Sequence, residues 1–244
     1  MDTATQALSG KQVVILGGSS GLGLATAKHA AQAGASVIIV SGNQQNIDKA
    51  LQQLPAGSKG FAIDLRNEEN IKAFFEQCPE FDHLVYTAGE NLRFITLNDM
   101  DVNNAKEFFT LRFWSALAAV KYAAAKIRKG GSIGLISGIV SSRPGAGWSL
   151  GAAICGAVEA FGRAMAVELA PIRVNVVVAG VTKTNLWNSL SDTDRNNLYS
   201  AVSNSLLVKR VGEAEEIAQT FLFLMQNQFA TGQTFTIDGG TVLV

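Results

Sequence analysis

Short runs of apolar, mostly β-branched residues alternate with longer stretches of helical spacing along this chain. The short runs are apolar throughout rather than at every second position, which is typical of parallel strands covered on both faces. The pattern predicts a doubly wound α/β fold, in which a parallel sheet of about seven strands carries helices on both faces. The expected strands are residues 13–16, 37–40, 61–63, 84–87, 133–136, 173–178 and 234–237, and the expected helices are 21–33, 46–54, 67–77, 102–129, 150–170 and 213–226.

One segment interrupts this alternation. Residues 185–211 follow the sixth expected strand and mix polar residues with scattered large apolar ones. In an open parallel sheet, ligands bind outside the carboxyl ends of the strands, where loops can cover them. We therefore expect residues 1–244 to form a single domain with a substrate lid near 185–211.

The composition narrows the class of partner. The 244 residues are 48% hydrophobic, which suits one compact domain with a large core, and 20 Lys and Arg balance 20 Asp and Glu. Zero net charge and the lack of a basic run with interleaved aromatics exclude a nucleic-acid or membrane-surface partner. The first residues do not resemble a signal peptide, and Lys121 interrupts the apolar stretch at 113–125, so no membrane span is expected.

Cysteine usage points to a reducing compartment. Cys78 and Cys155 are the two cysteines, without C-x-x-C spacing or nearby histidines. Neither a disulfide framework nor a metal site is supported by this pattern. We expect a cytoplasmic protein without a bound metal.

A glycine-rich loop, L-G-G-S-S-G-L-G, follows the first expected strand at residues 16–23. Gly17, Gly21 and Gly23 are spaced to let the chain turn tightly, bring backbone N–H groups to a phosphate and pack the next helix on the sheet. Ser19 and Ser20 add hydroxyl donors. A turn can be rich in glycine for packing reasons alone, but here strand, loop and helix come in the order of a Rossmann-like dinucleotide site.

This loop resembles the T-G-x-x-x-G-x-G loop of the short-chain dehydrogenase/reductase family, with Leu16 in place of threonine. Further similarities follow in the family's order: F-A-I-D-L at 61–65, Y-T-A-G at 86–89 where the family has N-N-A-G, the segment 166–180, and the tail at 209–240. The resemblance covers essentially the whole chain and implies a bound nicotinamide dinucleotide. The implied cofactor residues are Gly17, Ser19, Ser20, Gly21, Leu22, Gly23, Ser41, Asn43, Asp64, Leu65, Ala88, Gly89, Gly180 and Thr184.

The end of the second expected strand bears on the choice of cofactor. NAD-preferring members of the family carry a carboxylate there for the ribose 2′-OH, whereas this chain reads V-S-G-N at 40–43 and has no acid before Asp48. The missing negative charge favours NADP(H) over NAD(H). Neither Ser20 nor Gly42, however, is the arginine or lysine that usually binds the 2′-phosphate.

The resemblance breaks down at the catalytic positions. The family's Y-x-x-x-K motif follows the fifth strand, with a serine at the end of that strand and an asparagine in the preceding long helix; the lysine lowers the pKa of the phenol that donates the proton. A gap-free alignment on residues 157–170 puts Gly151 at the tyrosine, Cys155 at the lysine, Gly138 at the serine and Arg112 near the asparagine. Loss of a general acid typically costs ~10²–10⁴ in rate, so ordinary carbonyl reduction is not expected.

Other residues can be weighed as substitutes. The literal Y-x-x-x-K match at 122–126 lies in the long helix before the fifth strand and is expected to face away from the crevice. Arg112, Ser137 and Tyr199 are the candidate catalytic residues. The guanidinium of Arg112, at an inward helix position, needs an acid, a carbonyl or a phosphate as its partner. A structural ion pair would provide such a partner without any catalytic role.

The replaced tyrosine also changes the predicted shape of the site. Glycine at this position predicts an enlarged pocket, lined by Trp148, Leu150 and Trp187. The small residues of the helix at 150–162 would let two such helices approach closely, and the resemblance implies a homodimer or homotetramer.

Three functions are compatible with these residues. The first is an NAD(P)(H)-binding oxidoreductase that acts on a small-molecule carbonyl or hydroxyl through substitute groups or water. The second is a catalytically inactive NADP(H)-binding sensor or scaffold, and the third is a non-redox enzyme that uses the widened pocket. Family resemblance favours the first and the missing acid favours the second.

Overall fold

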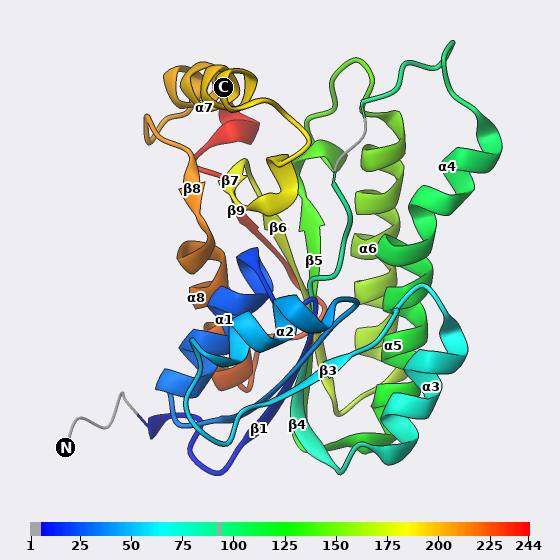
Figure 1. Ribbon diagram of the computed structural model, residues 1–244, viewed down its shortest axis with the longest axis vertical. Coiled ribbons are helices and arrows are strands. Elements are labelled where there is room, and N and C mark those ends of the chain that lie inside the picture. The colour runs from blue at the N-terminus through cyan, green and yellow to red at the C-terminus, as the bar shows by residue number, and fades with distance from the viewer. Residues whose placement is uncertain (1–5, 92–93) are drawn as a thin grey trace.

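The computed structural model describes residues 6–91 and 94–244, and its centre is a seven-stranded parallel sheet (Figure 1). The strand order is β3-β2-β1-β4-β5-β6-β9, with the change of direction between β1 and β4. Each expected strand has a counterpart, so the predicted fold class is confirmed. The strands are β1 Gln12–Leu16, β2 Ser36–Ser41, β3 Lys59–Ala62, β4 Phe81–Tyr86, β5 Ile127–Gly138, β6 Arg173–Ala179 and β9 Thr234–Ile237.

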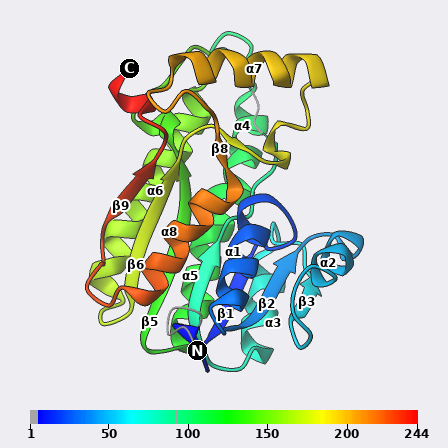
Figure 2. The same ribbon diagram turned by 90° about the vertical axis from the view of Figure 1, so that its left-hand side faces the viewer.

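Helices cover both faces of the sheet because each presents an apolar side to it. One buried cluster joins the strands to α3 (Glu68–Gln77), α5 (Ser115–Ala123) and α6 (Ser149–Glu168). A second joins the opposite face to α1 (Gly21–Gln32), α2 (Gln44–Leu51) and α8 (Ala214–Gln226). Figure 2 shows α1 and α8 together on one side of the strands.

The expected helix at 102–129 is wrong in two respects. It is divided into α4 (Val102–Phe109), a π-helical turn at Thr110–Trp114, α5 and a short 3₁₀ turn. The chain then enters β5 at Ile127, earlier than the expected start at residue 133. Ile127 pairs with Phe81, and Arg128 donates to Asp82 at 2.9 Å. These contacts between residues distant in sequence bring the polar start of β5 into the sheet.

The predicted lid segment contains a 3₁₀ turn at Asn185–Trp187 and helix α7 (Asp192–Ser205). A small second sheet, β7 (Thr182–Lys183) with β8 (Gly212–Glu213), joins the two ends of this segment. Figures 1 and 2 show α7 at the end of the molecule beyond the carboxyl ends of β5 and β6. That this segment moves as a lid stays a prediction.

Helix α6 has a length and a mean hydropathy, 1.4, that a membrane-spanning helix would also have. Only 17% of that apolar window is buried in the structure. One side of α6 packs on β5 and β6, as a helix of a layered α/β fold does, so its composition alone is weak evidence for a membrane span.

Candidate functional site

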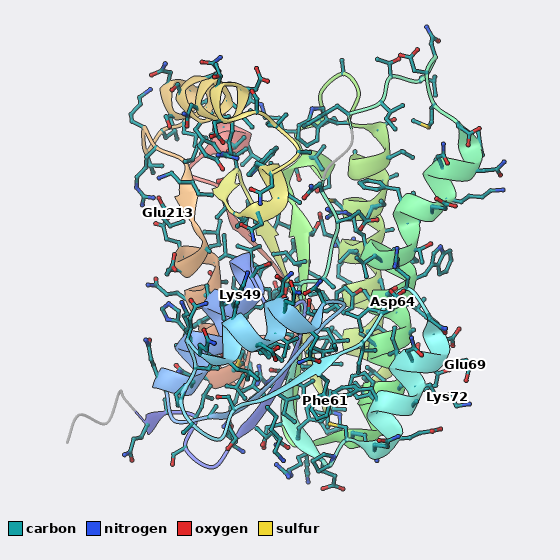
Figure 3. The ribbon with its side chains drawn as sticks, in the orientation of Figure 1. Lys49, Phe61, Asp64, Glu69, Lys72 and Glu213 are labelled. Atoms are coloured by element: carbon teal, nitrogen blue, oxygen red, sulfur yellow. The ribbon has the colours of Figure 1, made fainter. Side chains whose placement is uncertain are left out.

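A cavity of about 1000 Å³ lies at the carboxyl ends of the strands and runs from the β3–α3 loop, past the glycine loop, to the end of β5. Figure 3 labels Asp64 on the segment that joins β3 to α3. The cavity brings together all the residues that the resemblance implied for the cofactor except Asn43. Asn43 is instead the N-cap of α2, where its side chain accepts from the N–H of Asn46 at 3.0 Å.

The glycine loop is packed so closely that side chains could not replace Gly17 or Gly23. Gly17 has φ +89°, and a Cβ there would lie 2.5 Å from the backbone nitrogen of Ala88. A Cβ on Gly23 would collide with the carbonyl oxygen of Gly17. The following helix, α1, begins without an acidic residue or a side-chain cap in its first turn. Its N-terminal N–H groups therefore face the cavity as an anion site of the kind that holds a pyrophosphate.

The far end of the cavity is lined by the ends of β2 and β3. Ser19 donates to Ser41 at 2.8 Å, which ties the glycine loop to β2. Asp64 accepts from Arg66 through Nε and Nη2, both at 2.9 Å, and these bonds hold the pKa of the Asp64 carboxyl below its usual value. Arg66 also lines the cavity, and our sequence analysis missed it. A cation two residues after Asp64, which the resemblance implied for the cofactor, was the available signal.

Tyr86 and Thr87, which stand where the family has two asparagines, form hydrogen bonds to neighbouring parts of the chain. Tyr86 is 2% exposed, and its hydroxyl donates to the carbonyl of Leu111 in the π-helical turn. Burial raises the pKa of Tyr86, so the hydroxyl keeps its proton. Thr87 donates to the carbonyl of Leu16 at 3.2 Å. The Tyr86 bond fixes the turn that carries Arg112 against β4, and the Thr87 bond ties the end of β4 to the end of β1.

Arg112 lies inside this cavity, directly beside Gly89. A Cβ on Gly89 would lie 3.0 Å from Nη1 of the guanidinium, and the Arg112 side chain is 19% exposed. Nη2 donates to the carbonyl of Glu90, and the ring of Phe108 lies 5.3 Å from the guanidinium carbon. Burial lowers the pKa of Arg112 and the charge of Glu90 opposes this shift. A guanidinium keeps its proton even so, which leaves a buried cation in the cavity.

The acid that this cation requires is Glu90, which our sequence analysis did not identify. Nε of Arg112 lies 3.8 Å from Oε2 of Glu90, and both atoms are buried without a hydrogen-bond partner. The pair is therefore close enough for electrostatic attraction but too long for a hydrogen bond. Nε faces Glu90 and is shielded from solvent, so a ligand in the cavity would meet the guanidinium on the side of Nη1, which lies beside Gly89 and is not one of these buried atoms.

Three of the four positions aligned with the family's catalytic residues meet at this cavity. Gly138 and Cys155 line it together with Arg112, and a Cβ on Gly138 would lie 3.4 Å from Sγ of Cys155. Burial raises the pKa of the Cys155 thiol, which keeps it protonated and weakly reactive. Gly151 is not among the lining residues; a Cβ there would lie 3.6 Å from Cγ1 of Val140.

Ser137 lines the cavity, but its hydroxyl is engaged. It donates to Oε1 of Glu159 at 2.9 Å, and the same carboxylate oxygen accepts from Ser141 at 2.6 Å. Glu159 was not a candidate in our sequence analysis because the carboxylate and the two serines lie on separate elements. The one proton of Ser137 is directed away from a ligand in this arrangement.

Several predicted positions lie elsewhere. Tyr199 on α7 is not among the residues that line the cavity, and neither are Trp148 and Leu150. Trp148 packs edge-on against Phe94, with ring centroids 4.6 Å apart. Trp187 does line the cavity, and its Nε1 donates to the carbonyl of Thr182 at 2.9 Å. The prediction of a pocket wall was therefore right for Trp187 and wrong for Trp148 and Leu150.

The literal Y-x-x-x-K match faces outward, as predicted. Tyr122 donates to Glu68 at 2.7 Å beside Lys121, and Lys126 donates to the carbonyl of Glu76. Within residues 6–91 and 94–244, no three His, Cys, Asp or Glu side chains gather in a way that would hold a metal ion.

Comparison with known proteins identifies the family. The model of the family described as enoyl-(acyl carrier protein) reductase matches residues 17–242. The short-chain dehydrogenase/reductase ucsE of an Acremonium species is 30% identical over 97% of both chains. Carbonyl reductase family member 4 of Danio rerio is 30% identical over 95% of this chain and 98% of its own. The chain belongs to the short-chain dehydrogenase/reductase family.

Solved structures of short-chain dehydrogenases support this membership. A small-chain dehydrogenase crystallised with NADPH is 35% identical, covers 96% of this chain and 99% of its own, and has a TM-score of 0.86. The MalC reductase/Diels-Alderase of Malbranchea aurantiaca is 28% identical over 99% of this chain and 100% of its own, with a TM-score of 0.91. The family is one of oxidoreductases that bind nicotinamide dinucleotides, and the cavity described above has the glycine loop for such a cofactor.

Proposed function

We propose that this chain is an NADPH-dependent reductase of conjugated carbonyl compounds, in which Arg112 stabilises the negative charge that develops on the substrate oxygen. The observation that carries the proposal is the largely buried guanidinium of Arg112, 19% exposed, in the same cavity as the glycine loop. Electrostatic stabilisation by a fixed donor in a site of low dielectric is worth more than it would be in water. NADPH, when bound, supplies the hydride.

The missing general acid decides which carbonyl substrates are suitable. Hydride addition to a simple ketone produces an alkoxide, which is strongly basic and needs a proton in the same step. Hydride addition to an α,β-unsaturated carbonyl produces an enolate, whose charge is delocalised and which a guanidinium can hold until water protonates it. Gly138 and Gly151 offer no side-chain proton, and the raised pKa of Cys155 makes its thiol a poor acid. The enoyl substrate named in the matched family's description fits this chemistry.

The cavity's other residues have binding roles in this proposal. The N-terminus of α1 holds the pyrophosphate, and Asp64 and Leu65 border the adenine. Glu90 keeps Arg112 in place by the attraction of its carboxylate and by its backbone carbonyl, which accepts from Nη2. Trp187, 4% exposed, helps to exclude water from the end of the cavity near β6.

A second function is also compatible with Gly138, Gly151 and Cys155 at the positions of the family's serine, tyrosine and lysine. A protein that binds NADPH and performs no reaction would also have no need of the family's tyrosine and lysine. One experiment distinguishes the two: the purified protein is titrated with NADPH and NADH by fluorescence, and NADPH oxidation is then followed with a matched enone and saturated ketone. We expect tight NADPH binding and oxidation with the enone only. Binding without oxidation by either compound would support the sensor or scaffold function, and no binding would contradict both.

We also propose that the chain assembles into a homodimer or homotetramer through the exposed side of α6. Val167 on α6 is 81% exposed, and Trp114 at the end of the π-helical turn is 56% exposed. Small residues on α6, including Ala152, Ala153 and Gly156, would allow a second α6 to approach closely. The two free cysteines support a reducing, cytoplasmic location.

A further inference from the structure

The phosphate that distinguishes NADPH from NADH requires a positive charge that the usual positions lack. Gly42 follows β2 without a side chain, and a Cβ there would lie 3.8 Å from the carbonyl oxygen of Ile63. Ser19 and Ser41, the neighbouring side chains, are uncharged and bonded to each other at 2.8 Å. A phosphate at this end of the cavity would therefore meet hydroxyl groups but no cation from the glycine loop or from the end of β2.

Arg66 supplies a cation at this end from a different element. Among the described residues that line the cavity, the basic side chains are Arg66 and Arg112. Arg112 lies beside Gly89, which follows β4, rather than at the end of β2. Arg66 follows β3, the strand that pairs with β2, and its side chain is 67% exposed. It is therefore accessible to a ligand that extends along the end of β2.

We propose that Arg66 binds the 2′-phosphate of NADPH while it remains bonded to Asp64, and that this contact sets the cofactor preference. The inference rests on the proposed function, because it assumes that the cavity holds a nicotinamide dinucleotide. A guanidinium carries five N–H donors, and Asp64 uses one on Nε and one on Nη2. The remaining donors are free to form charge-assisted hydrogen bonds with phosphate oxygens.

The pair with Asp64 contributes to selectivity in a second way. A carboxylate at this position would repel a nearby phosphate, and the guanidinium compensates that charge. The same bonds hold the guanidinium at the cavity. The backbone N–H of Arg66 also donates to Asp64 at 3.1 Å, and the side chain of Asn70 donates to the Asp64 carbonyl. Arg66 is thus positioned before the cofactor arrives, which reduces the entropy lost on binding.

The test compares ligands that differ only in this phosphate. Dissociation constants of the full-length protein are measured for NADPH and NADH, and for adenosine 2′,5′-bisphosphate and AMP, which lack the nicotinamide half. We expect Arg66→Gln to raise the dissociation constants of NADPH and adenosine 2′,5′-bisphosphate by roughly 10- to 100-fold. The dissociation constants of NADH and AMP should change less than about twofold. Added salt should weaken NADPH binding to the wild type more than to the variant.

Lys72→Gln is the matched control, because Lys72 is a nearby cation on α3 that is 42% exposed and outside the cavity lining. It removes the same charge and should leave the NADPH preference unchanged. If Arg66→Gln lost affinity for NADPH and NADH equally, or lost no affinity, the inference would be overturned while the reductase function stands. Wild-type protein that binds NADH as tightly as NADPH would do the same. Failure of the wild type to bind either dinucleotide would overturn the inference and the proposed function together.

Discussion

The sulfur atom of Cys155 lies 3.4 Å from the point that a Cβ on Gly138 would occupy. These residues come from α6 and from the end of β5, and both line the cavity. The positions that align with the family's lysine and serine are therefore neighbours in the wall of the cavity. This proximity gives a structural basis for restoring the family's chemistry by substitution.

The first prediction concerns this restoration. The triple variant Gly138→Ser/Gly151→Tyr/Cys155→Lys is expected to reduce saturated ketones at least ~10²-fold faster than the wild type, because it regains a general acid. NADPH oxidation with a simple ketone measures the gain. Gly138→Ser/Cys155→Lys, without the tyrosine, is the control and should show no gain. A folded triple variant that binds NADPH and still fails to reduce ketones would contradict the alignment at Gly151.

The second prediction concerns the bond between β4 and the π-helical turn. Tyr86→Phe removes the buried hydroxyl that donates to the carbonyl of Leu111, and we expect a loss of about 1–3 kcal/mol in the free energy of unfolding. Tyr122→Phe removes an exposed hydroxyl bond to Glu68 and should cost less. Denaturant unfolding of both variants tests the difference. Equal effects would mean that the Tyr86 bond contributes no more than a surface bond.

The third prediction concerns the reactivity of Cys155. Because burial raises the pKa of its thiol, alkylation by iodoacetamide should be slow at neutral pH and should still be accelerating above pH 9.0, the ordinary thiol value. Bound NADPH should protect Cys155, since the residue lines the cavity. Cys155→Ser separates its labelling from that of Cys78. A rate that reaches its plateau below pH 8 would show an activated thiolate and contradict the packing role.

The fourth prediction concerns acid sensitivity at the start of α8. Two bonds to Arg210 and one to the Glu213 backbone lower the pKa of Glu216 to about 2. A lowered carboxyl pKa stabilises the fold above the unfolded-state value, near 4.5, and this stabilisation is lost as pH falls toward 2. The difference in the free energy of unfolding between wild type and Glu216→Gln should therefore shrink from pH 7 to pH 3. A constant difference over this interval would show that the charge of Glu216 is irrelevant to stability.

The strands and the glycine loop were predictable because their signals are local. An apolar run defines a buried strand wherever it occurs, and the spacing of Gly17, Gly21 and Gly23 determines the turn without reference to distant residues. The early start of β5 was not predictable, since the polar residues at 128–131 join the sheet through the bond of Arg128 to Asp82.

The site was predictable only in part for the same physical reason. Arg112 was identifiable as a buried cation, but its partner Glu90 lies 22 positions earlier, beyond any helical or strand spacing. The error at Trp148 has a similar origin, because contact with Phe94, which comes from another loop, decides where the indole packs. Arg66 carried a local signal, its place after Asp64-Leu65, that becomes meaningful once the end of β3 is seen to border the cavity.

The role of Arg112 is the central claim, and it is tested most directly by enone-dependent NADPH oxidation in Arg112→Gln. Arg112→Lys keeps the charge, and Lys106→Gln, on the exposed side of α4, is the matched control. Loss of one oxyanion donor is expected to lower turnover by ~10²–10³ in Arg112→Gln, with the NADPH dissociation constant unchanged. Arg112→Lys should retain part of the activity, and Lys106→Gln all of it. Wild-type turnover that survives in a folded Arg112→Gln protein would contradict the account.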